Sequence, residues 1–178
     1  MVREMGRKTC ARHLIRILVA SMMLLVVINA RAQTVERAYC GEDGKAHVTY
    51  ADHSSKTIPP EAQQIGCTDI AIADDHRTFA WSMQVENCCT SYPISVAVIA
   101  MRDGKTTVLR SDQMVWQWHF IDNGNRIAIL SGPVHGTATE ADLYDVPTGK
   151  KLATWEGSGG VPEWAGGWED QFGSDENQ

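Results

Sequence analysis

Short runs of Val, Ile, Thr and aromatic residues, separated by turn sequences, fill the chain from residue 68 to residue 155. This composition is typical of half-buried strands, and no segment there has the hydrophobic period of an amphipathic helix. We therefore predict an all-β fold, with strands at residues 69–73, 78–83, 94–101, 106–110, 115–120, 126–130, 141–145 and 152–155.

The turns between these segments favour tight hairpins. Asp103-Gly104 and Asn123-Gly124 are residue pairs that adopt positive φ at little cost, as two-residue hairpin loops require. Residues 147–150, Pro-Thr-Gly-Lys, form a third turn sequence. The segments should therefore pair as antiparallel sheets.

The predicted strands repeat along the chain. IAIADDHRTFAW aligns with the segment that contains HFIDNGNRIAI at an offset of 48 residues, which places Asp74 on Asp122. Gly104 falls on Gly149 at an offset of 45 residues. A repeat of about 45 residues with four short strands is the period of a β-propeller blade. We predict two propeller-blade-like, four-stranded antiparallel sheets, at about residues 68–114 and 115–165.

These two sheets are too few to close a propeller, which needs at least about four blades. The N-terminal segment, residues 33–67, adds half a blade at most. Its alternating pattern predicts a strand at residues 46–51, with residues 56–58 as the partner in a β-hairpin. Either the sheets pack face to face, or copies of the protein complete each other as a homo-oligomer.

Beyond Trp155 the chain is rich in glycine and acidic residues, and it has no Val, Ile or Leu after Val161. This composition predicts a flexible acidic tail at residues 166–178. One of the two tryptophans in this region, Trp164 or Trp168, is expected to dock back onto the sheets.

The first 32 residues have the pattern of a signal peptide. Five basic residues precede an apolar run at residues 17–28, and Ala30-Arg31-Ala32 supplies the small residues that signal peptidase requires. The apolar run is shorter than the roughly 20 residues that span a bilayer. We expect cleavage after Ala32, a secreted or periplasmic location, and no stable membrane anchor after cleavage.

Removal of this leader changes the charge of the protein. The full chain has a net charge of −6, but the leader carries six of its 16 basic residues and one of its 22 acidic ones, so the remainder is near −11. Such a chain repels phosphate backbones, which argues against nucleic acid as a partner. A protein or a small-molecule ligand remains as the expected partner.

Four cysteines follow the leader: Cys40, Cys67, Cys88 and Cys89. An even number in an exported chain indicates disulfides, for which three connectivities exist. A bond between the adjacent Cys88 and Cys89 would close a strained ring. We therefore favour two bridges that join Cys88 and Cys89 to Cys40 and Cys67, with a vicinal bond beside Cys40–Cys67 and free thiols as the alternatives.

Several of these segments together carry a family resemblance: DDHRTFAW, NCCTSYPISVAVIAMRDGK, WQWHFIDNGNRIAIL, GPVHG and LYDVPTGKKLATWEG. Over about residues 68–157 the chain resembles exported bacterial WD40-like or TolB-like β-propeller-related proteins of no assigned activity. The resemblance implies an all-β fold in the cell envelope and supplies no catalytic residues. The remaining blades of a full propeller are missing from this chain.

Two groups of residues are candidates for binding or chemistry. His135 lies in a loop between two glycines, from which it could act as a general base or as a ligand. Glu140 and Asp142 follow it on one face of a strand. Trp116, Trp118 and His119 occupy another strand, where alternation puts both tryptophans on one face and His119 on the other. The tryptophans belong either to the core or to a patch that binds a partner or a carbohydrate.

The sequence contains no complete catalytic constellation and no metal-ligand spacing, so we expect neither a cofactor nor a metal site. The hypothesis we prefer is an exported, non-catalytic β-propeller-like binding or scaffolding protein of the cell envelope. Two hypotheses compete with it. One is a small hydrolase or metal-dependent enzyme centred on His135, and the other is a redox-responsive envelope protein that uses Cys88 and Cys89.

Overall fold

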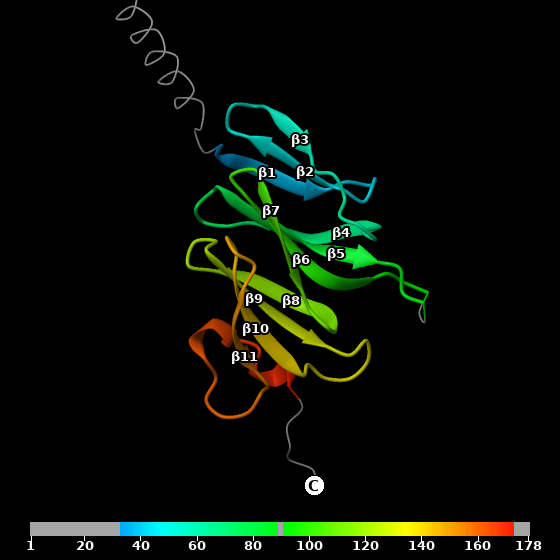
Figure 1. The fold of residues 1–178 in the computed structure, drawn as a ribbon, viewed down its shortest axis with the longest axis vertical. Coiled ribbons are helices and arrows are strands. Elements are labelled where there is room, and N and C mark those ends of the chain that lie inside the picture. The colour runs from blue at the N-terminus through cyan, green and yellow to red at the C-terminus, as the bar shows by residue number, and fades with distance from the viewer. Residues whose placement is uncertain (1–32, 89–90, 173–178) are drawn as a thin grey trace, which may run out of the picture. The chain divides into compact units, whose positions relative to one another are not determined.

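The computed structural model describes residues 33–88 and 91–172, so the predicted signal peptide, Cys89 and residues 173–178 lie outside the described residues. Three antiparallel sheets make up the described part of the chain, and none of them closes into a barrel (Figure 1). The fold is all-β, as predicted. Among the described residues, no helix is long and apolar enough to cross a membrane.

The N-terminal sheet has three strands in the order β1-β2-β3: β1 (Val35–Cys40), β2 (Ala46–Tyr50) and β3 (Ser55–Thr57). It contains the predicted hairpin. The strand β1, which the sequence did not predict, pairs with the other edge of β2.

The other two sheets are four-stranded meanders, named blade one and blade two, that confirm the predicted blade-like repeats. Blade one consists of β4 (Gly66–Ile72), β5 (Thr78–Val85), β6 (Ile94–Arg102) and β7 (Lys105–Arg110). Blade two consists of β8 (Met114–Ile121), β9 (Arg126–Gly132), β10 (Glu140–Asp145) and β11 (Lys151–Trp155). Each strand pairs with its neighbours in sequence, as short hairpin turns require.

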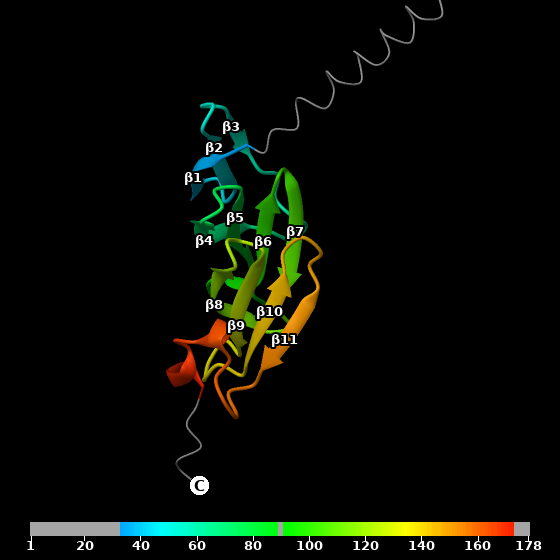
Figure 2. The same ribbon diagram turned by 90° about the vertical axis from the view of Figure 1, so that its left-hand side faces the viewer.

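Blade one lies between the N-terminal sheet and blade two (Figure 1, Figure 2). Side chains alternate across β5, so Phe79 and Trp81 pack against the N-terminal sheet while Ala80 packs against blade two. All six residues from Thr78 to Met83 are buried as a result. A strand covered on both faces is apolar almost throughout, which explains the continuous run FAW in this segment.

The outer faces of the two end sheets of the stack differ. On β2 the inward residues Ala46 and Val48 are buried, and the outward positions His47 and Thr49 are polar. At the other end, residues 156–172, named the C-terminal segment, pack against the outer face of blade two. The sheets therefore pack face to face without the closure of a ring.

The C-terminal segment differs from the tail predicted from the sequence. Two short 3-10 helices, η1 (Glu163–Ala165) and η2 (Glu169–Gln171), lie in it, and Trp168 between them is buried. Trp168 and Ala165 join a core with the blade two residues Leu130 and Leu143. Residues 166–172 therefore contact blade two instead of extending away from it, because the buried Trp168 and the partly buried Phe172 supply apolar contacts in the absence of aliphatic side chains.

The favoured disulfide pairing is wrong, and the Cys40–Cys67 bond that belonged to an alternative pairing is present instead. Cys40 on β1 bonds to Cys67 on β4, with a Cα–Cα distance of 5.5 Å, and so joins the N-terminal sheet to blade one. Cys88 is an exposed free thiol in the loop after β5. The reason is topological: β1 packs against β4, whereas the β5–β6 loop projects beyond the end of its sheet (Figure 1).

Replacement of both Cys40 and Cys67 by alanine should lower the free energy of unfolding by about 3–4 kcal/mol, because the bond closes a loop with a sequence separation of 27 residues. Denaturant unfolding followed by fluorescence measures this change. Cys88→Ala is the matched control and should change stability by less than about 0.5 kcal/mol, since Cys88 is exposed. Peptide mapping without reduction that joined Cys40 or Cys67 to Cys88 would contradict the assignment.

Candidate functional site

A groove of about 450 Å³ lies between the first strands of the two blades, β4 and β8, which form edges of their sheets on the same side of the stack (Figure 2). This volume is in the range of small-molecule sites. We name it the β4–β8 groove. The eight residues that line it are Asp69, Ile70 and Ala71 from β4, and Trp116, Gln117, Trp118, His119 and Phe120 from β8.

A β-bulge interrupts each of the two strands at the groove. On β8 the pairing register shifts between Val115 and Gln117, so Trp116 has no partner on β9. On β4 the register shifts between Thr68 and Ala71. Bulges re-aim side chains and prevent an edge strand from adding a further strand, so both strands present side chains to the groove rather than a regular backbone edge.

The bulge at Trp116 corrects the predicted alternation on β8. Trp118 and Phe120 pack between the blades, as residues on one face should. Trp116 instead packs with the residues on the outer face of blade two, because the extra residue at the bulge reverses the order of faces. The prediction that Trp116 and Trp118 share a face is therefore wrong.

The two tryptophans of β8 are held in place by their indole N–H groups. Trp116 Nε1 donates to the carbonyl oxygen of Pro133 at 3.2 Å, and Trp118 Nε1 donates to Ser82 Oγ at 3.0 Å. The Trp118 ring also meets Phe120 edge to face, with 5.4 Å between ring centroids. Both rings are half-buried, so parts of fixed aromatic surfaces face the groove.

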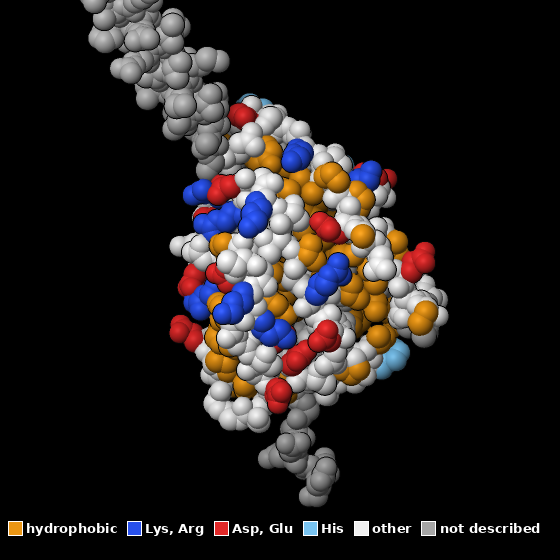
Figure 3. Space-filling model, viewed as in Figure 1, with side chains coloured by type: hydrophobic (Ala, Val, Ile, Leu, Met, Phe, Trp, Pro, Cys, Tyr) orange, Lys and Arg blue, Asp and Glu red, His pale blue; other side chains and the backbone are white. Residues whose placement is uncertain are grey.

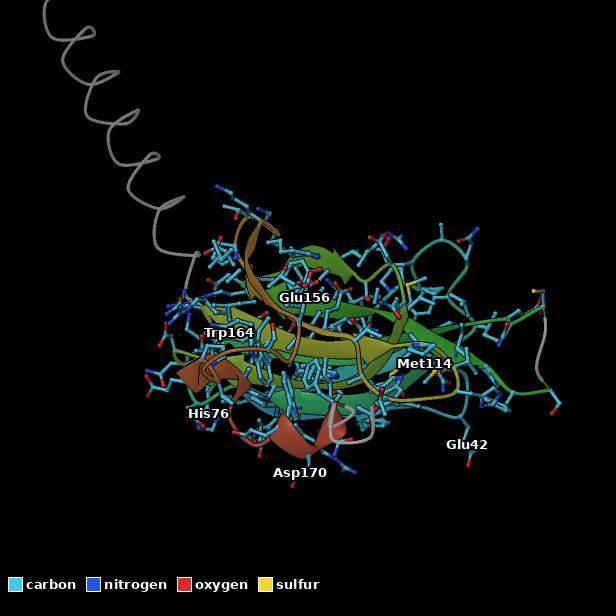
Figure 4. The ribbon with its side chains drawn as sticks, turned by 90° about the horizontal axis from the view of Figure 1, so that it is seen from below. Glu42, His76, Met114, Glu156, Trp164 and Asp170 are labelled. Carbon is cyan, nitrogen blue, oxygen red and sulfur yellow. A yellow bond between two sulfur atoms is a disulfide. The ribbon has the colours of Figure 1, made fainter. Side chains whose placement is uncertain are left out.

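His119 connects the groove to the C-terminal segment. Its Nε2 donates to the carbonyl oxygen of Trp164 at 3.1 Å, and its ring lies 4.6 Å from the ring of Trp168. Trp168 Nε1 in turn donates to Gln117 Oε1 at 3.0 Å. Seen from below, the segment that carries Trp164 and Asp170 lies across the near end of blade two (Figure 4). These contacts fix the C-terminal segment to β8.

Burial lowers the pKa of His119 below its usual value of 6.5, although the hydrogen bond to Trp164 opposes this effect. The imidazole is therefore neutral near pH 7. Asp69 is then the only charged residue in the lining of the groove. Its side chain is exposed, and among the described residues no hydrogen bond or ion pair engages its carboxylate.

The lining of the groove is mainly aromatic. Its eight residues include no Ser, Thr, Cys or Lys, and its polar side chains are those of Asp69, Gln117 and His119. The described residues, 33–88 and 91–172, contain no cluster of three His, Cys, Asp or Glu side chains that could hold a metal ion. What the groove offers is aromatic surface, one amide and one carboxylate.

The structure places the other predicted site residues away from this groove. His135 is exposed in the β9–β10 loop, and no hydrogen bond or ion pair among the described residues joins it to Glu140 or Asp142. Glu140 Oε1 accepts a hydrogen bond from Ser131 Oγ at 3.4 Å. Cys88 lies on the β5–β6 loop.

Asp142 is buried in blade two with three partners. Lys151 Nζ lies 2.5 Å from Asp142 Oδ2, Thr154 Oγ1 donates to Oδ1 at 2.5 Å, and the Tyr144 hydroxyl donates to Oδ2 at 3.3 Å. Burial, with the Asp142 charge beside it, raises the pKa of Tyr144. These contacts join β10 to β11, which is a structural role for Asp142.

Sequence analysis identified the tryptophans and His119 but missed Asp69 and Gln117. The 48-residue offset of the repeat aligns these two residues with each other, so both occupy the bulged region of the first strand of a blade. The repeat was therefore the pattern that could have located the groove.

No protein-family model matches this chain, and a search of curated proteins finds no significant match. The class of protein is defined by the fold and the site alone. It is an open stack of three antiparallel sheets, with an aromatic groove at the edge where its two blade-like repeats meet.

Stability should decrease as the pH falls below about 6.5, in part because of His119. The folded state disfavours the charged imidazole, so its contribution is complete above pH 6.5 and is lost as the pH falls toward the lowered pKa. His119→Gln keeps an N–H donor for Trp164 without a titrating ring, and its melting temperature should fall less between pH 7 and pH 5 than that of the parent protein.

His135→Gln is the matched control for this measurement, since His135 is exposed in a loop outside the groove. It should retain the pH dependence of the parent protein. Equal slopes for the parent and His119→Gln would show that burial of His119 does not contribute.

Proposed function

We propose that this chain is an exported, non-catalytic binding protein of the cell envelope, related to β-propellers, and that the β4–β8 groove holds its ligand. The observation that carries the proposal is the groove itself: its volume of about 450 Å³, its fixed aromatic surfaces and its single unpartnered carboxylate. Apolar walls with a few oriented polar groups are typical of ligand sites. Its ligand is a small molecule or a protein segment.

The cysteines and the leader sequence support export. Disulfides such as Cys40–Cys67 persist in oxidising compartments and are rare in the cytosol. The basic residues, the short apolar run and Ala30-Arg31-Ala32 are the features that direct a chain through a secretion pathway. A periplasmic or extracellular location agrees with both.

The two four-stranded meanders are the feature on which the proposed relation to WD40-like or TolB-like proteins rests. His76 has a φ of 52°, and Gly124, its counterpart at the 48-residue offset, has a φ of 81°. Gly104 and Gly149, which align at the 45-residue offset, have φ values of 78° and 70°. The two blades therefore share a left-handed residue at these positions, although the rest of the turns differs: Asp122 and Asn123 have positive φ and their counterparts Asp74 and Asp75 do not.

Export predicts a processed N-terminus. Expressed with its leader in a bacterial host, the protein should appear outside the cytoplasm with Gln33 as its first residue, as measured by intact mass. Replacement of Ala30 and Ala32 by arginine should block processing, because signal peptidase accepts only small side chains there. Cytoplasmic accumulation of unprocessed parent protein would contradict export.

Blocking the groove should abolish ligand binding. Ala71 is exposed on β4 and lines the groove, so Ala71→Trp fills the space without removal of a core side chain. In a small-molecule screen followed by the indole resonances of Trp116 and Trp118, compounds that shift these resonances in the parent protein should lose their effect in Ala71→Trp.

Ala62→Trp places the same side chain at an exposed position outside the groove and is the control. Its binding should match that of the parent protein, and both variants should keep the parent melting temperature within a few degrees. Binding that survives Ala71→Trp, or a screen in which no compound shifts either resonance, would refute the groove as the ligand site.

A further inference from the structure

Four side-chain polar groups of the β4–β8 groove are engaged inside the protein. The indole N–H groups of Trp116 and Trp118 already donate to Pro133 and Ser82. His119 Nε2 donates to the carbonyl oxygen of Trp164, and Gln117 Oε1 accepts from Trp168 Nε1. The side chains then offer a ligand aromatic surface, the Gln117 amide N–H groups, the His119 Nδ1 acceptor and the Asp69 carboxylate.

The charge of the groove is negative. Asp69 is exposed and unpartnered among the described residues, His119 is neutral because burial lowers its pKa, and no Lys or Arg lines the groove. Lys and Arg side chains are instead visible on the face of the molecule shown in Figure 3. The full chain is acidic as well, with a net charge of −6.

These features exclude several kinds of ligand. An anion would meet Asp69 with no basic residue in the lining to balance it. A polyhydroxylated sugar needs several free donors and acceptors, and those of the groove are mostly engaged. An extended peptide strand would need a regular edge, but both β4 and β8 are bulged at the groove. A compact cation with apolar substituents satisfies all three constraints.

We propose that the β4–β8 groove binds a small organic cation, such as a substituted ammonium ion, and this inference rests on the proposed function of the groove as a ligand site. The alkyl groups contact the aromatic side chains that line the groove, Trp116, Trp118 and Phe120, whose ring quadrupoles attract positive charge. Asp69 supplies the opposite charge. Because the ring faces are fixed by hydrogen bonds, little ordering is required when the ligand binds.

Choline and its uncharged isostere, 3,3-dimethylbutan-1-ol, test this proposal. The two probes have the same shape and differ in the charge at one atom. In titrations followed by the indole resonances of Trp116 and Trp118, choline should bind saturably and at least tenfold more tightly than the isostere. Equal affinities of the two probes would overturn the proposal, and this comparison needs only the parent protein.

Asp69→Asn should weaken the binding of choline at least fivefold and leave that of the isostere unchanged. Asparagine tolerates the positive φ of 50° at this position, so the backbone is preserved. Asp74→Asn is the matched control: it removes the same charge from an exposed position outside the groove and should leave the affinity for choline unchanged. Equal effects of the two substitutions would overturn the role of Asp69.

A third probe, Nα-acetyl-lysine amide, separates a free small cation from the side chain of a protein partner. Choline should bind more tightly than this probe, and the reverse order would overturn the assignment to a small cation. If choline fails while screened compounds still bind in the groove and lose binding in Ala71→Trp, the ligand class is wrong and the proposed function stands. If nothing binds in the groove, both are wrong.

Discussion

Blade one is covered on both faces, and the rest of the structure depends on this double burial. Large side chains such as Trp81 and Met83 fill its contact with the N-terminal sheet, whereas small ones such as Ala80 and Ala100 let blade two approach closely on the other face. A substitution on β5 or β6 therefore affects one of two separate cores, depending on which face of the sheet the side chain occupies. The disulfide between β1 and β4 reinforces the contact with the N-terminal sheet.

The groove is a consequence of this arrangement. The inner strands β5, β6 and β9 are buried between neighbouring layers, whereas the first strands β4 and β8 lie at sheet edges, and both are bulged where they border the groove. Trp116, Trp118 and Phe120 on β8 each pack partly against a hydrophobic core and also line the groove. Stability and binding surface come from the same residues.

Sequence patterns predicted all eight strands of the blades because alternation and turn chemistry are local properties. β1 escaped prediction because its sequence, VERAYC, has charged residues at two of six positions and most of the strand is not buried. The Cys40–Cys67 bond depends on the proximity of β1 and β4, which no local pattern reveals. A bulge shifts by one residue the alternation of side chains between the two faces of a sheet. The face that Trp116 occupies therefore could not be predicted without the pairing of β8 with β9.

Each hydrophobic core is built by adjacent layers alone, which gives the chain a direction of assembly. The core between the N-terminal sheet and blade one contains no residue of blade two, so these two layers can pack before blade two folds. The outer face of blade two, with Leu143 and Trp155, stays bare until Trp168 emerges. A chain truncated before Trp168 therefore exposes an apolar surface that favours aggregation, so the last residues of the fold protect the complete protein from it.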